Sequence, residues 1–138
     1  DVNVLALCIC TREAITDMRA DGDRGHIIHI SSMAGHRNPG GSGVYSATKF
    51  AVRSLTEGLR RELRAAKSQI RIGSVSPGYV ETRFAARYSK SEEAAREVYN
   101  SMDVIQPEDV ANTVTFMLSQ PPHVQIHDIL MRPTEQVS

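Results

Sequence analysis

The sequence lacks several features that would place it in a membrane, on nucleic acid or in a disulfide-linked fold. It has no tryptophan, only two cysteines and a formal net charge of zero, with 16 lysines and arginines against 16 aspartates and glutamates. Proteins that bind nucleic acid usually carry a clear basic excess. The basic residues between 60 and 71 are interleaved with acidic ones such as Glu62, which is typical of a solvated helix face. We therefore expect no nucleic-acid partner.

The cysteines and histidines show no pattern of a disulfide or a metal site. Cys8 and Cys10 lie two positions apart in a segment with helical periodicity, where their side chains point to different faces, and we expect both thiols to be reduced. The five histidines lack the spacing of metal ligands, so we predict no metal. No apolar run approaches the ~18 residues of a membrane span, and no leader segment opens the sequence. These absences predict a cytoplasmic protein without a membrane span.

The hydrophobic pattern alternates between strand-like and helix-like segments. Short apolar runs rich in β-branched residues predict strands at 26–31, 70–76 and 124–131. The first two runs lack polar alternation, which is typical of strands covered on both faces of a parallel sheet. Apolar residues at helical spacing, together with helix start and stop signals, predict helices over 1–20, 44–66, 89–101 and 107–118.

Two of these helices carry recognisable start signals. Ser89 and Glu92 have the spacing of a capping box, so we expect a helix to begin at Ser89 and to run to about residue 101. Pro107 suits the first position of the next helix, because a proline there gives up no helical hydrogen bond. Glu108 and Asp109 follow it and face the positive end of the helix dipole.

The order of elements predicts one α/β domain. Strands separated by helices are typical of right-handed crossovers, which build a parallel sheet with helices on both faces. A length of 138 residues is about that of a single domain. Three strands alone leave the first one with an unpaired edge, a liability that proteins avoid. We therefore expect the strand at 26–31 to have a further partner outside this sequence.

Three residues around a glycine-rich loop carry the clearest chemical signal. Ser32 follows the strand at 26–31, at the end of a parallel strand where open α/β sheets place their ligands. Tyr45 and Lys49 lie four positions apart near the start of a helix, so their side chains share a face. A protonated lysine beside a phenol favours the phenolate, and we expect it to lower the pKa of Tyr45 from its ordinary ~10. Such a phenol exchanges a proton with a carbonyl or alcohol oxygen, which the Ser32 hydroxyl would hold.

Context decides how this pair is interpreted. Taken alone, a tyrosine and a lysine at this spacing are more often exposed surface residues of a helix. Here, however, the pair follows a glycine-rich loop, and Ser32 lies thirteen residues before Tyr45. This arrangement favours the catalytic interpretation.

Four motifs in order resemble the active-site signature of a known family. They are the tyrosine and lysine of YSATK, the upstream serine of IIHISSMAG, the Pro-Gly and threonine of SPGYVET (76–82), and the asparagine of DVNVLAL. Together they resemble the short-chain dehydrogenases/reductases, in their compact subfamily, and the resemblance runs over essentially all 138 residues. It implies a Rossmann-type domain of which residues 1–138 are the carboxyl-terminal catalytic portion. By this resemblance the dinucleotide-binding amino-terminal half would lie outside these residues, so we expect this chain alone not to hold the cofactor.

The resemblance also implies roles for individual residues. Tyr45 would be the catalytic acid/base, and Ser32 would stabilise the reacting oxygen. Lys49 would hold the ribose hydroxyls of the cofactor, and Asn3 would anchor a water in a proton relay. The residues implied to bind the cofactor are Tyr45, Lys49, Pro77, Gly78, Val80 and Thr82.

By the same resemblance, the protein is an NADP-dependent oxidoreductase, with NAD as the other possible cofactor. Its substrate would be a hydrophobic alcohol and the matching ketone or aldehyde, of steroid or isoprenoid type. The helices at 1–20 and 44–66 would pair into a homodimer or homotetramer. Two alternatives stay open: a truncated, non-catalytic remnant that acts only in dimerisation, and a sugar-nucleotide epimerase of the extended branch.

Several further residues have two interpretations. Tyr79, Phe84, Tyr88 and Met102 would form an apolar lid over the substrate or would pack in the core. His36, in the loop after Ser32, is expected to face solvent rather than substrate. We interpret His26 and His29 as ordinary polar residues at the ends and faces of a strand.

Overall fold

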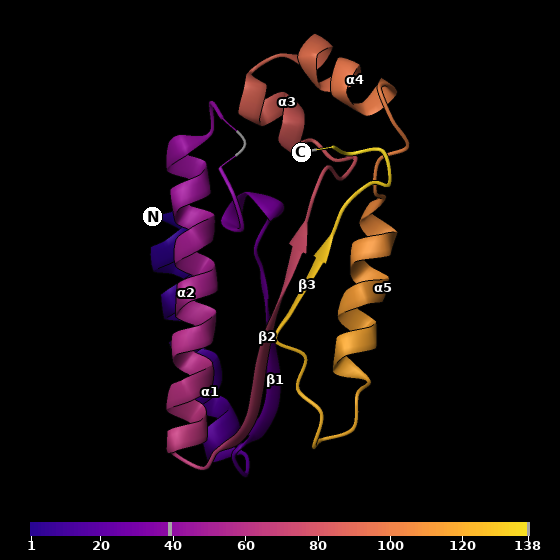
Figure 1. Ribbon diagram of the computed structural model, residues 1–138. Coiled ribbons are helices and arrows are strands. Elements are labelled where there is room, and N and C mark those ends of the chain that lie inside the picture. Colours follow the sequence, from indigo (N-terminus) through magenta and orange to yellow (C-terminus); the bar gives the residue numbers. More distant parts are fainter. Residues whose placement is uncertain (39, 138) are drawn as a thin grey trace.

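The computed structural model describes residues 1–38 and 40–137, and its centre is a three-stranded parallel sheet (Figure 1). The strands are β1 (Arg24–Ile30), β2 (Gln69–Pro77) and β3 (Asp128–Met131), in the order β1-β2-β3. Ile28 lies opposite Gly73, and Val75 lies opposite Ile129. Within the described residues β1 pairs only with β2. Because all three strands are parallel, their carboxyl ends meet at one edge of the sheet.

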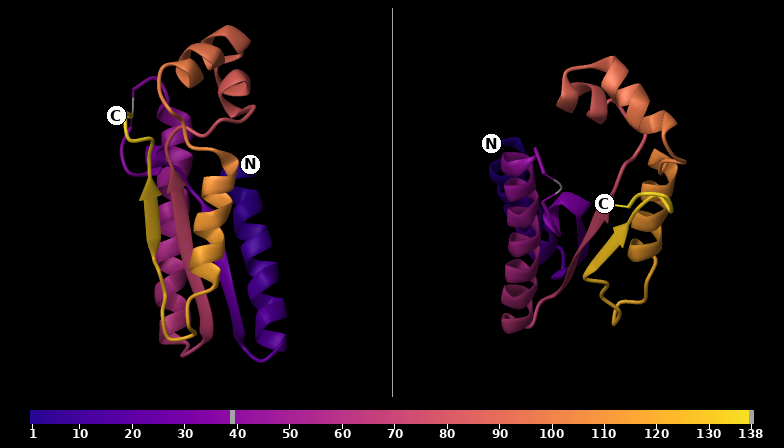
Figure 2. Two further views of the ribbon diagram at one scale, coloured as in Figure 1. Left: turned by 90° about the vertical axis from the view of Figure 1, so that its right-hand side faces the viewer. Right: turned by 45° about the horizontal axis from the view of Figure 1, so that its top comes forward.

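Helices cover both faces of this sheet, as the order of elements predicts. On one face lie α1 (Leu7–Ala20), which continues a short π-helix η1 (Val2–Ala6), and α2 (Gly43–Ala65). On the other face lies α5 (Pro107–Leu118), and Figure 2 shows the strands between α5 and the α1–α2 pair. The short helices η2 (Met33–Gly35), α3 (Phe84–Ser89) and α4 (Glu92–Asn100) lie toward the carboxyl ends of the strands. In the part of the chain that the structure describes, no helix is both long and apolar enough to cross a membrane.

The main core lies between the sheet and helices α1 and α2. Leu63, Ile70 and Ile72 are almost completely buried and form its centre. Partly buried apolar residues surround them: Ile15, Met18, Ile27 and Leu59. Burying one such side chain contributes about 1.5–3 kcal/mol, so this cluster fixes β1 and β2 against both helices.

The last strand is shorter than the sequence pattern indicates. A strand was expected over 124–131, but β3 begins only at Asp128. Around Val124 and Gln125 the chain is bound to β2 by side-chain hydrogen bonds and not by main-chain pairing. Gln125 Oε1 accepts from the Ile72 amide at 3.1 Å. The guanidinium of Arg71 also donates to the Val124 carbonyl at 2.9 Å. These contacts take the place of main-chain pairing at that end of β2.

The segment after Pro77 forms two helices where one was expected. The prediction that a helix begins at Ser89 is wrong, because Ser89 ends α3, where its hydroxyl donates to the Ala85 carbonyl at 2.7 Å. Lys90 then adopts a left-handed conformation with φ 55°, which stops the helix. Ser91 is the actual cap of α4, and its hydroxyl accepts from the Ala94 amide at 3.1 Å.

Candidate active site

A cavity of about 730 Å³ opens at the carboxyl ends of β1 and β2. Its walls come from the start of α2, from η1, from the segments that follow both strands and from α3 and α4. Open α/β sheets bind their ligands at this edge. Every residue that the sequence singled out for catalysis or cofactor binding lines the cavity: Asn3, Ser32, Tyr45, Lys49, Pro77, Gly78, Val80 and Thr82.

Ser32 stands at the turn between β1 and η2. Its backbone is extended, with φ −168°, and its Oγ accepts from the Ala34 amide at 3.1 Å, so that it caps the short helix. The same hydroxyl is directed at the Pro77 carbonyl at 3.5 Å, a long contact. Ser32 also hydrogen-bonds the phenol of Tyr45, which favours a lower pKa for that phenol. The serine is therefore held between the ends of the two strands and the catalytic candidate.

Tyr45 lies in the first turn of α2 and is half-buried. Its ring packs against Phe84 and Tyr88 of α3, with centroid distances of 5.4 and 5.7 Å. Burial beneath these rings raises the pKa of Tyr45, and the hydrogen bond from Ser32 only partly opposes it. Tyr45 therefore carries its proton at neutral pH in this structure.

Lys49 shares the cavity with Tyr45 but does not tune it as expected. Its Nζ donates to the Ile30 carbonyl at 3.0 Å and lies 5.8 Å from the centroid of the Tyr45 ring. Burial lowers the pKa of Lys49 itself. The prediction that Lys49 lowers the pKa of Tyr45 is wrong for this structure, because burial of the phenol raises its pKa and the ammonium is directed at the Ile30 carbonyl.

Asn3 lines the cavity and also contacts helix α2. It lies in the π-helix η1, a local geometry that is frequent at functional sites. Its amide nitrogen donates to the Thr48 hydroxyl at 3.0 Å, and that hydroxyl donates to the Tyr45 carbonyl at 2.7 Å. Sequence reasoning missed Thr48, although it lies inside the YSATK motif. Asn3 and Thr48 together fix the turn of helix that carries Tyr45 and Lys49.

The segment after β2 lines the cavity and is held from one side by Ile105. Val80 forms a parallel β-bridge with Ile105. The Ile105 amide donates to the Tyr79 carbonyl at 3.1 Å, and the Glu81 amide donates to the Ile105 carbonyl at 2.9 Å. Because successive peptide groups of an extended segment point to opposite sides, Val80's own amide and carbonyl face away from Ile105. Thr82 is exposed, and its hydroxyl accepts from the Phe84 amide at 3.1 Å.

Three of the four lid candidates line the cavity. Tyr79, Phe84 and Tyr88 face it, whereas Met102 is not among the residues that line it. The rings of Phe84 and Tyr88 are stacked with centroids 5.6 Å apart, yet the two residues remain 51% and 48% exposed. Packing in the core therefore does not account for them. They form an apolar wall directly over Tyr45.

His36 is not the solvent-facing loop residue that the sequence indicated. Its Nε2 lies 2.9 Å from Asp128 Oδ2, and the other oxygen of that carboxylate accepts from the hydroxyls of Ser74 and Ser76. Burial and the nearby Arg53 lower the pKa of His36, and Asp128 opposes this. Asp128, at the start of β3, was missed by sequence reasoning. The pair joins the segment that carries Ser32 to β3.

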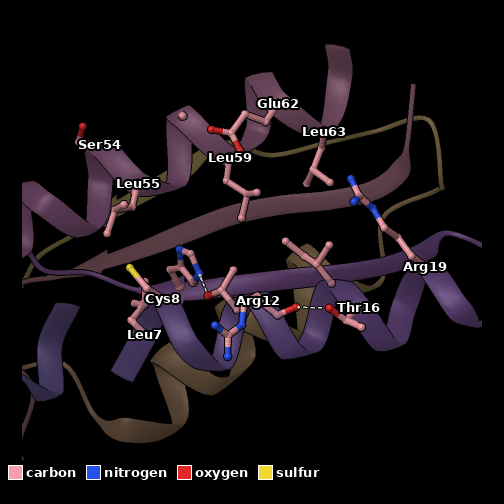
Figure 3. Close-up of a pocket in the computed structure, with 14 residues that line it drawn as sticks. Leu7, Cys8, Arg12, Thr16, Arg19, Ser54, Leu55, Leu59, Glu62 and Leu63 are labelled. Carbon is pink, nitrogen blue, oxygen red and sulfur yellow. Dashed lines mark hydrogen bonds between the residues drawn. The ribbon is translucent and has the colours of Figure 1, made fainter. Parts of the chain in front are cut away.

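A second cavity, of about 460 Å³, lies between α1 and α2 (Figure 3). His29 lies on the sheet side of it, and its ring nitrogens bond the hydroxyls of Thr11 at 3.0 Å and Thr56 at 2.8 Å. His29 is only 6% exposed, and burial lowers its pKa. It is therefore a buried link between β1 and both helices, not an ordinary polar residue of a strand face.

Comparisons with known proteins identify the family and the fold of this chain. The family model described as short chain dehydrogenase matches residues 1–93. The chain belongs to this family. The short-chain dehydrogenase fold predicted from the motifs is also confirmed by the solved structure of the closed form of serine dehydrogenase complexed with NADP+. That structure has a TM-score of 0.85 and 33% sequence identity, covering 93% of this chain and 51% of the other.

Two relatives with names are similar to the chain in sequence. Dehydrogenase/reductase SDR family member 11 of Bos taurus is 58% identical over 142 residues, which covers 100% of this chain and 56% of the relative. Farnesol dehydrogenase of Aedes aegypti is 36% identical over 135 residues, which covers 96% of this chain and 52% of the relative. The chain thus spans about half the length of the curated relatives it matches.

Proposed function

We propose that the complete protein is a cytoplasmic, NADP-dependent oxidoreductase that interconverts a hydrophobic alcohol with its ketone or aldehyde. The observation that carries this proposal is the convergence of Ser32, Tyr45 and Lys49 on one cavity beneath an aromatic wall. A proton donor, a second hydroxyl and a cation around an apolar space are what a carbonyl reductase needs.

The groups on the cavity fit a nicotinamide nucleotide. The ammonium of Lys49 has three donors, and the Ile30 carbonyl takes one of them at 3.0 Å, so that Lys49 would hold ribose hydroxyls with the others. The peptide groups of Val80 and the hydroxyl of Thr82 would hold the carboxamide. When bound, the nicotinamide supplies or accepts the hydride at the substrate carbon. The NADP+ bound to the similar serine dehydrogenase supports NADP, with NAD as the alternative.

The protonation state of Tyr45 favours an acid role. Because burial raises the pKa of Tyr45, its hydroxyl keeps a proton that it donates to the carbonyl oxygen as that oxygen becomes negative. The Ser32 hydroxyl, which hydrogen-bonds Tyr45, would donate to the same oxygen and hold it in place. In the reverse direction the phenolate of Tyr45 would accept the proton of the alcohol.

The wall of the cavity supports an apolar substrate of steroid or isoprenoid type. Phe84 and Tyr88 stack above Tyr45, and Met33, Ala95 and Val98 add further apolar surface. An apolar wall with a few convergent polar groups is typical of a site for a hydrophobic small molecule. The relative from Aedes aegypti is named for farnesol, an apolar alcohol, which supports the same substrate class.

The outer faces of the helices support a homodimer or homotetramer. Leu5 and Ile9, with Phe50 and Leu55 of α2, are large apolar residues that remain exposed. A second copy packed against these helices would bury these side chains, and exposed apolar surface of this kind is typical of interaction sites. Sedimentation of the full-length protein should give a dimer or tetramer, and a monomer would contradict this part of the proposal.

Turnover by the full-length protein tests the function. Two ketones that share the reacting group, one with a long apolar chain and one with a hydroxylated chain of equal length, are each mixed with NADPH or NADH. We expect oxidation of NADPH with the apolar ketone to be fastest. Preference for the hydroxylated ketone would contradict the substrate class, and no turnover of either ketone would favour the non-catalytic remnant.

A further inference from the structure

The chain returns to the cavity after β3. In Figure 1 the segment that follows β3 runs back to the ends of the strands, below α3. Gln136 belongs to this terminal segment, is only 6% exposed and lines the cavity. Its main chain is fixed by a turn in which its amide donates to the Pro133 carbonyl at 3.0 Å. A buried glutamine side chain thus lies at the site, although it is far away in the sequence from the other residues that line it.

The carboxamide of Gln136 contacts both loops that carry the candidate site residues. Its Oε1 accepts from the main-chain amide of Tyr79 at 3.1 Å, within the segment that follows β2. Its Nε2 contacts the sulfur of Met33, the residue next to Ser32. One side chain therefore connects the Ser32 loop to the segment 77–80.

The fit around this carboxamide is close. A Cβ placed on Gly78 would lie 2.2 Å from Gln136 Oε1 and 3.1 Å from the Cγ of Arg132. Gly78 also donates its amide to the Met131 carbonyl at 2.7 Å. The absence of a side chain at position 78 is what lets the carboxamide reach the main chain of the segment 77–80.

We propose that Gln136 is a positioning residue of the active site. By accepting from the Tyr79 amide, its carboxamide fixes the segment 77–80, and with it the peptide groups of Val80, relative to Ser32. Its effect on catalysis rests on the function proposed above, because Val80 is there a cofactor-binding residue. Loss of the Gln136 acceptor frees a main-chain amide that is otherwise held, and the segment loses its fixed position.

Two variants of Gln136 and one matched control test this role in the full-length protein. Gln136→Met keeps the length of the side chain but removes the acceptor, whereas Gln136→Glu keeps the acceptor. Gln125→Met is the control, because Gln125 Oε1 also accepts from a main-chain amide, that of Ile72 at 3.1 Å, away from the cavity. The measurements are hydrogen exchange of the peptide that spans 77–81, kcat, and KM for the cofactor and the substrate.

We expect Gln136→Met to speed exchange of the Tyr79 amide by about tenfold, because its hydrogen bond to Gln136 is what protects this amide in a partly exposed segment. The cofactor KM should rise with little change in the substrate KM, and Gln136→Glu should restore both readouts. Gln125→Met should leave them as in the wild type. Unchanged exchange in Gln136→Met, or equal kinetic losses in Gln136→Met and Gln125→Met, would overturn the proposal. If the wild-type protein transfers no hydride, the proposed function fails, and the exchange result alone decides whether Gln136 fixes the segment.

Discussion

Replacing Ser32 with alanine removes a hydroxyl that caps a short helix and that, in the proposed function, also acts on the substrate oxygen. The hydroxyl caps η2 through the Ala34 amide at 3.1 Å, and it hydrogen-bonds Tyr45, where it favours a lower pKa against the effect of burial. In Ser32→Ala only the causes that raise the pKa of Tyr45 remain. The limb of the pH–rate profile that reports Tyr45 should therefore move to higher pH.

The size of the loss follows from the two contacts. Removing a capping side chain costs about 1 kcal/mol of stability. A hydrogen bond to a charged group contributes about 1.5–3 kcal/mol, and each 1.36 kcal/mol corresponds to a tenfold change in rate, so kcat should fall by about 10- to 150-fold. The loss of activity should thus be much larger than the small loss of stability explains.

The assay is the pH profile of kcat for hydride transfer, measured beside a urea denaturation curve. Ser46→Ala is the matched control, because its hydroxyl donates to the Ala34 carbonyl at 2.7 Å and so holds the same short helix without lining the cavity. The control should lose stability and keep the pH profile. A Ser32→Ala protein with the kcat and pH profile of Ser46→Ala would refute the assignment of Ser32.

Two further predictions concern the scaffold beneath the site. Burial lowers the pKa of His29 from 6.5, so the unfolded chain takes up a proton at a pH where His29 of the folded chain stays neutral. The contribution of His29 to stability is therefore complete above pH 6.5 and is lost as the pH falls toward the lowered folded pKa. His29→Gln should flatten this dependence in denaturation curves between about pH 5 and pH 8, and an unchanged slope would contradict it. Leu63 is 1% exposed at the centre of the core, so Leu63→Ala should lower the free energy of unfolding by about 2–5 kcal/mol. A loss below about 1 kcal/mol in urea denaturation would show that the cluster is not the main core, because even Ile→Val typically costs 0.5–1.5.

Much of the fold follows from local patterns. The spacing of apolar residues predicted the helix at 44–66 and the first two strands to within about two residues, because each element buries a continuous face along its own length. The helix predicted over 1–20 is also present, but its residues 2–6 form a π-helix and α1 begins only at Leu7. The division between α3 and α4 was not predictable in this way. It depends on the left-handed conformation of Lys90, which nothing in the residue type demands.

In the candidate site, too, the local features were predictable from the sequence and the long-range features were not. Tyr45 and Lys49 lie four positions apart on one helix, so their shared face is a local property that the sequence shows. The direction of the pKa shift of Tyr45 is not local, because it depends on burial beneath rings from α3. Likewise, Gln136 is separated from Tyr79 by 57 residues, and only the completed fold brings them together.

The central claim is that Tyr45 exchanges the proton that accompanies hydride transfer. The most direct measurement is kcat of the full-length Tyr45→Phe protein, with cofactor affinity measured separately by titration. The ring and its contacts with Phe84 and Tyr88 persist in this variant, so only the hydroxyl is lost. We predict a fall in kcat of about 10²- to 10⁴-fold, the usual contribution of general acid–base catalysis, and a much smaller loss of cofactor affinity. Activity within tenfold of the wild type would contradict the account.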